Sequence, residues 1–167
     1  MAAITDLATL THTDLAVGDW LVVHDLSAAT DKKVAPFATG SWTPALNFGG
    51  ATTGITYSGA AGIYVVVGKL VFVQGVLALT SKGSATGNAS VGGLPITSAA
   101  SQAAWLTLAW QSMTSSYVNM IGYVATGVTT ISIRGITAAS TQNVTNVTNA
   151  GFANNTILYI HGTYSAA

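Results

Sequence analysis

The chain has 167 residues, a formal net charge of zero and no cysteine, and only 6% of its residues are charged. The lack of cysteine excludes a disulfide framework and a thiolate metal site, and the basic residues beyond position 33 are too few and too scattered for a nucleic-acid-binding surface. An ordinary soluble domain has about 25% charged residues, so we expect much of this surface to be covered by copies of the chain or by a larger assembly.

Residues 1–40 are predicted to form an arm that is distinct from residues 41–167. All acidic residues lie within the first 33 positions, which carry a formal charge of −3 (five Asp against Lys32 and Lys33), and the remainder carries +3. The start of the chain lacks the basic and apolar regions of a secretory signal, so we expect none. The arm is expected to attach the protein to a particle through apolar side chains: Leu7, Leu10, Leu15 and Trp20.

Within this arm the pattern predicts two short strands. The stretch DWLVVHD at 19–25 is typical of a strand, 26–31 of a turn, and 32–36 of a short return strand. Residues 38–40 are a plausible joint to the second part of the chain.

The run GIYVVVGKLVFVQGVLALT at 62–80 decides the fold class. Its length would allow a membrane helix, but Lys69 would then lie near the middle of the span, where a charge is costly. The run is rich in β-branched residues, which favour extended structure, and Gly68-Lys69 is a two-residue turn signal. We therefore predict a hairpin of strands 62–67 and 70–80, with Gly75 at a bulge or kink, rather than a membrane element or a buried helix.

The rest of the second part is also predicted to be strands separated by clusters of Gly, Ser, Thr and Asn. Many short strands with regular turns indicate an all-β sandwich or barrel. Leu94-Pro95 is predicted to be an extended corner, and NVTNVTN at 143–149 a polar loop or an edge strand. The remaining strands are expected at 42–48, 55–58, 104–111, 117–125, 128–134 and 156–164.

Candidate catalytic groups are scarce. No carboxylate follows Asp31, whereas glycan hydrolysis usually needs two carboxylates. The histidines His12, His24 and His161 have no motif around them that would make a triad or a metal site. A cluster of one His161 from each of three subunits is conceivable, but an ordinary packed or exposed imidazole is favoured. We expect no enzyme activity, no cofactor and no metal.

Aromatic and branched residues supply the candidate contacts between subunits. Trp105 and Trp110 lie five apart on one predicted strand, so they should face opposite sides. One is expected in the core, and the other at a subunit interface or, less favoured, on a sugar-binding surface. The predicted subunit interface comprises Val71, Phe72, Val73, Trp105 and Trp110.

Four ordered motifs follow residue 41: an opening Trp-Thr-Pro, a hairpin with the pattern Y…G-x-L-V-x-V-x-G, a Lys-Gly-Ser loop and a Gly-Leu-Pro corner, at 42–44, 64–75, 81–87 and 93–95. In these motifs the sequence resembles the C-terminal domains of tailed-bacteriophage fibres and other virion surface proteins. The resemblance covers about a third of the chain, and residues 1–33 also resemble a short attachment segment of phage structural proteins.

This resemblance implies a jelly-roll-like β-sandwich knob, usually trimeric, on the surface of a virus particle made in the host bacterial cytoplasm. Because no long shaft separates arm and knob, we expect a capsid decoration, cement or head-fibre protein. The alternative is a receptor-binding tail fibre or tail tip that recognises a host glycan. The implied partners are the chain itself, the major capsid protein or another virion protein, and, for the receptor-binding alternative, a host surface glycan. Nucleic acid and membrane insertion are not expected.

Overall fold

The computed structural model describes the backbone of residues 21–25, 30–34, 37–138 and 143–167, and the side chains of the last two ranges. The chain divides into two compact units, Met1–Ala38 and Thr39–Ala167. In the described ranges nearly all regular structure is strand, and the one helix is a single 3₁₀ turn at Asn149–Gly151. The predicted all-β class is confirmed.

The first unit contains an antiparallel hairpin of β1 (Leu21–Asp25) and β2 (Thr30–Val34). Its register pairs Leu21 with Val34 and Asp25 with Thr30. The two predicted strands of the arm are therefore present. The four residues expected to attach the arm, Leu7, Leu10, Leu15 and Trp20, lie outside the described residues, so their role stays a prediction.

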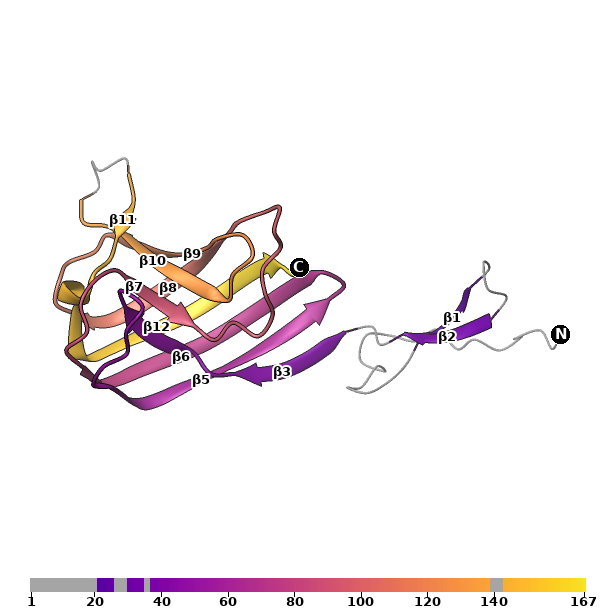
Figure 1. The fold of residues 1–167 in the computed structure, drawn as a ribbon, viewed down its shortest axis with the longest axis horizontal. Helices are drawn as coiled ribbons and strands as arrows, with labels where there is room; N and C mark the ends of the chain where they lie inside the picture. The colour runs from indigo at the N-terminus through magenta and orange to yellow at the C-terminus, as the bar shows by residue number, and fades with distance from the viewer. Residues whose placement is uncertain (1–20, 26–29, 35–36, 139–142) are drawn as a thin grey trace. The chain divides into compact units, whose positions relative to one another are not determined.

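The second unit is one curled sheet of ten strands. Its order is β3-β5-β6-β12-β8-β9-β10-β7-β4, with β11 paired to β10 beside this path (Figure 1). The strands are β3 (Ala38–Trp42), β4 (Ala45–Phe48), β5 (Ile55–Val67), β6 (Leu70–Lys82), β7 (Ala89–Gly92), β8 (Ala104–Met113), β9 (Asn119–Val124), β10 (Thr130–Ile136), β11 (Thr145–Asn146) and β12 (Phe152–Ser165).

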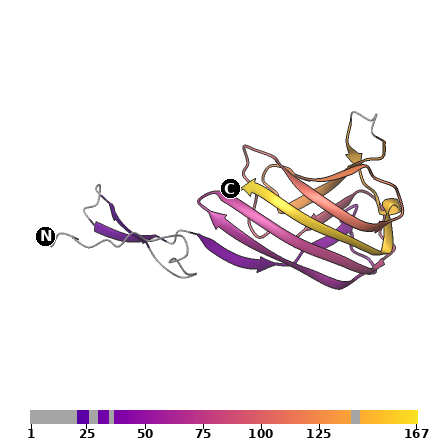
Figure 2. The ribbon, with the colours of Figure 1, turned by 180° about the vertical axis from the view of Figure 1, so that it is seen from behind.

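The sheet folds over so that its two ends approach each other. The consecutive strands β3 and β4 lie at opposite ends of the strand order, and Figures 1 and 2 show the layer of β5, β6 and β12 packed across from β7 and β10. The predicted single strand 42–48 is wrong, because Thr43-Pro44 breaks it into β3 and β4. Proline lacks an N–H and fixes φ, so the chain leaves one end of the sheet there and joins the other.

The predicted hairpin at 62–80 is confirmed as the end of the β5–β6 pair that contains the turn. Val67 pairs with Leu70. Gly68, the first central residue of the turn, takes a φ of +60°, the positive value that a primed turn requires there. The register shifts of this pair lie between Thr56 and Gly59, not at Gly75. Gly75 is therefore not a bulge.

The close approach of Trp42 explains why residue 75 is a glycine. Gly75 pairs with Gly62 across the hairpin, and the Trp42 indole lies over both. A Cβ at Gly75 would lie 2.8 Å from Trp42 Cζ2. The indole Nε1 donates a hydrogen bond to the Gln74 carbonyl at 3.1 Å. The two glycines thus make the space that seats the buried Trp42 ring.

The core lies between the two layers and is built from alternate residues of the strands. Phe48 on β4 and Phe152 on β12 meet edge to face, with ring centroids 5.1 Å apart, and both are fully buried. Val71 and Val73 are 0% and 2% exposed and belong to this core. Their predicted place at a subunit interface is corrected, because one chain already buries both side chains.

Two short strands come from segments without a clear strand pattern. β7 lies in the stretch predicted as a Gly- and Ser-rich loop, where it pairs with β4 and β10. β11 lies in the 143–149 tract and pairs with Arg134 and Gly135 at the side of β10, in line with an edge strand. Val147 beside it is buried, and its N–H donates to the Ile133 carbonyl at 3.0 Å.

Two tyrosine hydroxyls close the curled sheet, and their removal gives a testable prediction. Tyr57 accepts a hydrogen bond from Leu46 N at 2.9 Å, and Tyr164 donates one to the Ile96 carbonyl at 2.8 Å. We expect Tyr57→Phe and Tyr164→Phe each to lower the free energy of unfolding by about 1–2 kcal/mol, because a backbone group loses its partner. Urea unfolding measures the loss.

The same tyrosines predict a loss of stability at alkaline pH. Burial raises the pKa of both phenols above 10.0, and the hydrogen bonds with Leu46 and Ile96 oppose this rise only in part. A group whose pKa is higher in the folded state contributes its stability fully below the unfolded pKa, and loses it as the pH rises through the folded pKa. The double Phe variant should therefore lose less stability above pH 10 than the parent; an identical pH profile would contradict this.

Candidate functional site

The exposed side of β5, β6 and β12 carries large apolar side chains. Side chains alternate across a strand, and here the members of one set fill the core while those of the other face outward. We call the outward set the apolar face. It consists of Ile63, Val67, Leu70, Phe72 and Tyr159, which are 60%, 48%, 40%, 43% and 42% exposed.

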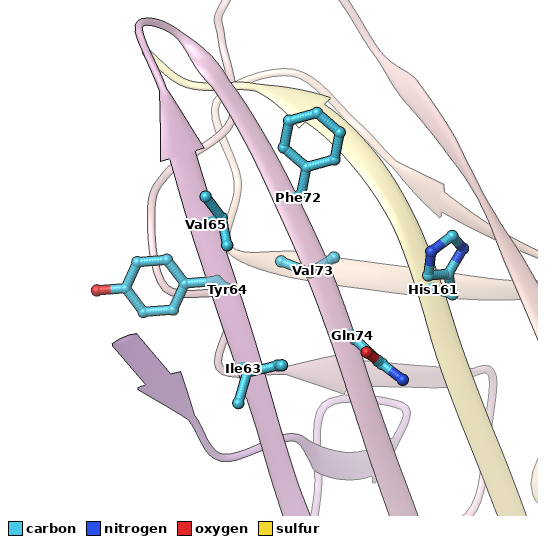
Figure 3. Close-up of a pocket in the computed structure, with 7 residues that line it drawn as sticks. All are labelled: Ile63, Tyr64, Val65, Phe72, Val73, Gln74 and His161. Carbon is cyan, nitrogen blue, oxygen red and sulfur yellow. The ribbon is translucent and has the colours of Figure 1, made fainter. Parts of the chain in front are cut away.

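The register places these residues in adjacent rows across the sheet. Ile63 lies opposite Gln74, and Gln74 lies opposite His161. Val65 and Phe72 form the next row. Figure 3 shows these five side chains along β5, β6 and β12, where they line a shallow hollow. The face is thus continuous over three strands, with an amide and an imidazole inside it.

A second group on the outward side joins two aromatic rings and a cation. Trp105 on β8 pairs with Tyr123 on β9, and their ring centroids are 4.7 Å apart. The Arg134 guanidinium on β10 lies 4.2 Å from the Tyr123 centroid and 5.5 Å from the Trp105 ring. We call these three residues the Trp105 cluster. Trp105 remains 52% exposed.

The outward side of β4, β7 and the N-terminal part of β10 has a different character. Ser90 Oγ donates a hydrogen bond to Asn47 Oδ1 at 2.7 Å, and Ser132 lies opposite Ser90. Thr130, opposite Gly92, is exposed. This polar side resembles an ordinary solvent-facing sheet surface. The contrast singles out the apolar face as the surface that a partner would cover.

The predicted interface residues divide between surface and core. Phe72 and Trp105 are exposed, and Trp110 is partly buried against the core. The prediction that Trp105 and Trp110 face opposite sides, one of them toward the core, is confirmed. Sequence reasoning missed Ile63, Val67, Leu70 and Tyr159. Ile63 and Val67 lie two positions on either side of Val65, which pairs with Phe72, and Leu70 lies two positions from Phe72 on β6. The period of two along the predicted hairpin was therefore a usable signal for these three residues.

Side chains that could act in catalysis or hold a metal ion are sparse on both sides of the sheet. His161 is exposed beside Gln74, and within residues 37–138 and 143–167 there is no Asp or Glu. The described part of the chain contains no group of three His, Cys, Asp or Glu side chains that could hold a metal ion. It also contains no helix long and apolar enough to cross a membrane. The arrangement offers surfaces for contact.

The described residues define an all-β protein with one curled sheet and an exposed apolar face. No protein family and no curated protein matches the sequence. A similar solved structure is the crystal structure of the Dettilon tailspike protein, with a TM-score of 0.67 and 18% sequence identity. The match covers 78% of this chain but only 24% of that chain. At this level of identity the likeness shows a shared fold.

Proposed function

We propose that the protein is a non-enzymatic structural subunit on the surface of a bacteriophage particle, assembled as a homotrimer through its apolar face. The single observation that carries the proposal is the set of large apolar side chains exposed on β5, β6 and β12. Contiguous apolar patches of this kind mark interaction surfaces. The fold shared with a tailspike protein supports a place in a phage particle.

A second copy of the chain fits this face better than a charged partner. The face carries no Asp, Glu, Lys or Arg, and His161 is its one basic side chain among the described residues, so most of its contacts would be apolar, as in the buried centre of homomeric interfaces. Three copies around an axis would hide the face while leaving the polar side of β4, β7 and β10 in water. A specific protein–protein interface usually buries about 1,200–2,000 Å² in total, and this is the area expected between two subunits of the trimer.

Within the particle, we place the protein on the tail, as part of a fibre or spike. The shared fold with a tailspike protein favours this position over the capsid decoration that the sequence led us to expect. The partners would be copies of this chain, another virion protein and a host surface glycan. Synthesis would take place in the host bacterial cytoplasm. A jelly-roll topology remains a prediction.

A charge placed on the apolar face tests the proposed trimer. We expect the parent protein to have three times the monomer mass in solution, and Phe72→Glu combined with Ile63→Glu to be monomeric, because six carboxylates cannot be buried without partners. Light scattering gives the mass, and circular dichroism checks that the sheet persists. Thr130→Glu, on the exposed polar side of β10, is the control and should remain trimeric. A parent protein that stays monomeric at millimolar concentration would refute the trimer.

Electron microscopy of the source particle tests the position. Antibody against this chain should label the tail or its fibres. Labelling of the capsid would instead make the protein a decoration or head-fibre protein, the alternative from the sequence. Particles that carry none of the chain would refute a virion function altogether.

A further inference from the structure

Arg134 is a cation without an acidic partner in its own part of the chain. Residues 37–138 and 143–167 contain no Asp or Glu. The side chain is partly exposed, and its Nε atom is buried without a hydrogen-bond partner within these residues. A guanidinium has five donors in a planar fork that matches a carboxylate. Within residues 37–138 and 143–167, no acidic side chain is present to neutralise the charge of this group.

The rings of the Trp105 cluster hold the guanidinium in place. Tyr123 lies 4.2 Å and Trp105 5.5 Å from the Arg134 carbon Cζ, within the range of cation–π attraction. A cation that rests on two rings loses less side-chain freedom when it binds a ligand, which favours affinity. The site is thus preorganised for one negative group.

The exposed part of Trp105 offers a second contact beside the cation. An aromatic face packs well against a flat apolar surface, and the C–H face of a pyranose ring is such a surface. Hydroxyl groups surround the cluster: Ser132 lies opposite Tyr123 on β10, and Thr107, two residues from Trp105, is exposed on the same side of β8. These groups suit the hydroxyls of a sugar.

We propose that the Trp105 cluster binds an acidic sugar, with Arg134 holding the carboxylate of a hexuronate residue and Trp105 packing against its ring. A nucleic acid fits less well, because binding a phosphate backbone needs several cations and one lies here. Residues 37–167 of a second copy have no acidic side chain to offer, and the five aspartates of residues 1–33 are the competing anions that the variant tests must exclude. The inference deepens the proposed function by naming the glycan and the surface that would bind it.

Trigalacturonate and its methyl ester form a matched pair of probes, because each carboxylate of the acid is replaced by an uncharged methyl ester and the sugar rings are the same. We expect the acid to shift the Trp105 indole N–H signal in the NMR spectrum of the intact protein, and to bind about 10–100-fold more tightly than the ester. This is the factor given by a charge-assisted hydrogen bond of about 1.5–3 kcal/mol. Equal affinity for both probes, or no shift with about 10 mM acid, would overturn the proposal.

Variants separate the cluster from general electrostatic attraction. Arg134→Gln should weaken acid binding about tenfold or more, and Arg134→Lys by less, because it keeps the charge but loses the planar fork. Lys69→Gln removes the same charge from the exposed β5–β6 turn and should change affinity less than about twofold. Trp105→Ala should weaken both the acid and the ester, and the acid by the larger factor, because the ring also holds the Arg134 guanidinium in place. Equal losses in Arg134→Gln and Lys69→Gln would overturn the proposal.

One further outcome would reassign the surface. If Arg134→Gln dissociates the trimer and the parent binds neither probe, the cluster is a subunit contact and the glycan proposal is wrong. The binding assay needs no particle, so its failure leaves the tests of trimer and virion position untouched.

Discussion

Gly62→Ala is expected to destabilise the protein by about 3 kcal/mol or more, the upper range for adding volume to a packed site. The new Cβ would overlap Trp42 Nε1 and would lie 2.7 Å from the Gln74 carbonyl oxygen. These two atoms are already joined by a hydrogen bond, so neither can move without breaking it. Chemical denaturation of the purified variant measures the loss.

Gly59→Ala is the matched control for this substitution. Gly59 lies on the same strand, and a Cβ there would meet nothing within 4 Å. A glycine-to-alanine change without a clash reduces the freedom of the unfolded chain and stabilises a protein by about 0.4–1 kcal/mol. The two variants should therefore shift stability in opposite directions. If Gly62→Ala were as stable as Gly59→Ala, the indole would not rest on Gly62.

Phe152→Ala is expected to cost about 3–5 kcal/mol, the range for emptying a fully buried aromatic site. Phe152 begins β12 and packs edge to face on Phe48 of β4, so it ties a central strand to the edge strand of the opposite layer. Loss of the ring should lower the melting temperature by about 12–20 °C, at about 4 °C for each kcal/mol, the value at which the ranges for smaller and larger domains meet.

Phe72→Ala tests the same residue type on the apolar face. Phe72 is 43% exposed and lies outside the core. We expect it to leave the stability of the folded monomer within about 1 kcal/mol of the parent and to weaken self-association instead. The pair is compared by urea unfolding at concentrations where the chain is monomeric. A larger loss in Phe72→Ala than in Phe152→Ala would reverse the assignment of core and surface.

Much of the fold could be predicted from the sequence where local patterns decide it. The β-branched run at 62–80 and its Gly68-Lys69 turn defined the central hairpin, because strand propensity and turn chemistry agree there. The placement of Trp105 and Trp110 on opposite sides followed from the period of two along β8, but the sequence did not say which of them faces the core. The all-β class rested on the same kind of pattern.

Features that depend on distant partners could not be predicted. β7 is a strand because β4 and β10 flank it, although its sequence looks like a loop. Gly75 looked like a bulge until Trp42, 33 positions earlier in the sequence, filled the space above it. Thr156 is polar but fully buried. Its burial is possible because its hydroxyl donates a hydrogen bond to the Ser112 carbonyl at 2.8 Å, at the point where the register of β8 and β12 shifts.

The candidate site was predictable only in part, for a related reason. Phe72 and Trp105 stood out as large aromatics, but Val71 and Val73 were assigned to the wrong side of β6. In a strand that is apolar throughout, composition does not say which face is inside. The Trp105 cluster draws its members from three strands, so only the sheet order brings Arg134 to Trp105 and Tyr123.

The packing of the Trp42 indole against Gly62 and Gly75 has a mechanical consequence. β3 is a five-residue strand at one end of the sheet, and the chain enters the second unit through it. A pulling force applied to the chain before Ala38 would act first on β3. The Trp42 indole, packed over Gly62 and Gly75, would resist the separation of β3 from the sheet. In a subunit attached through its N-terminal segment, the packing of Trp42 would therefore determine the force at which β3 separates from the sheet.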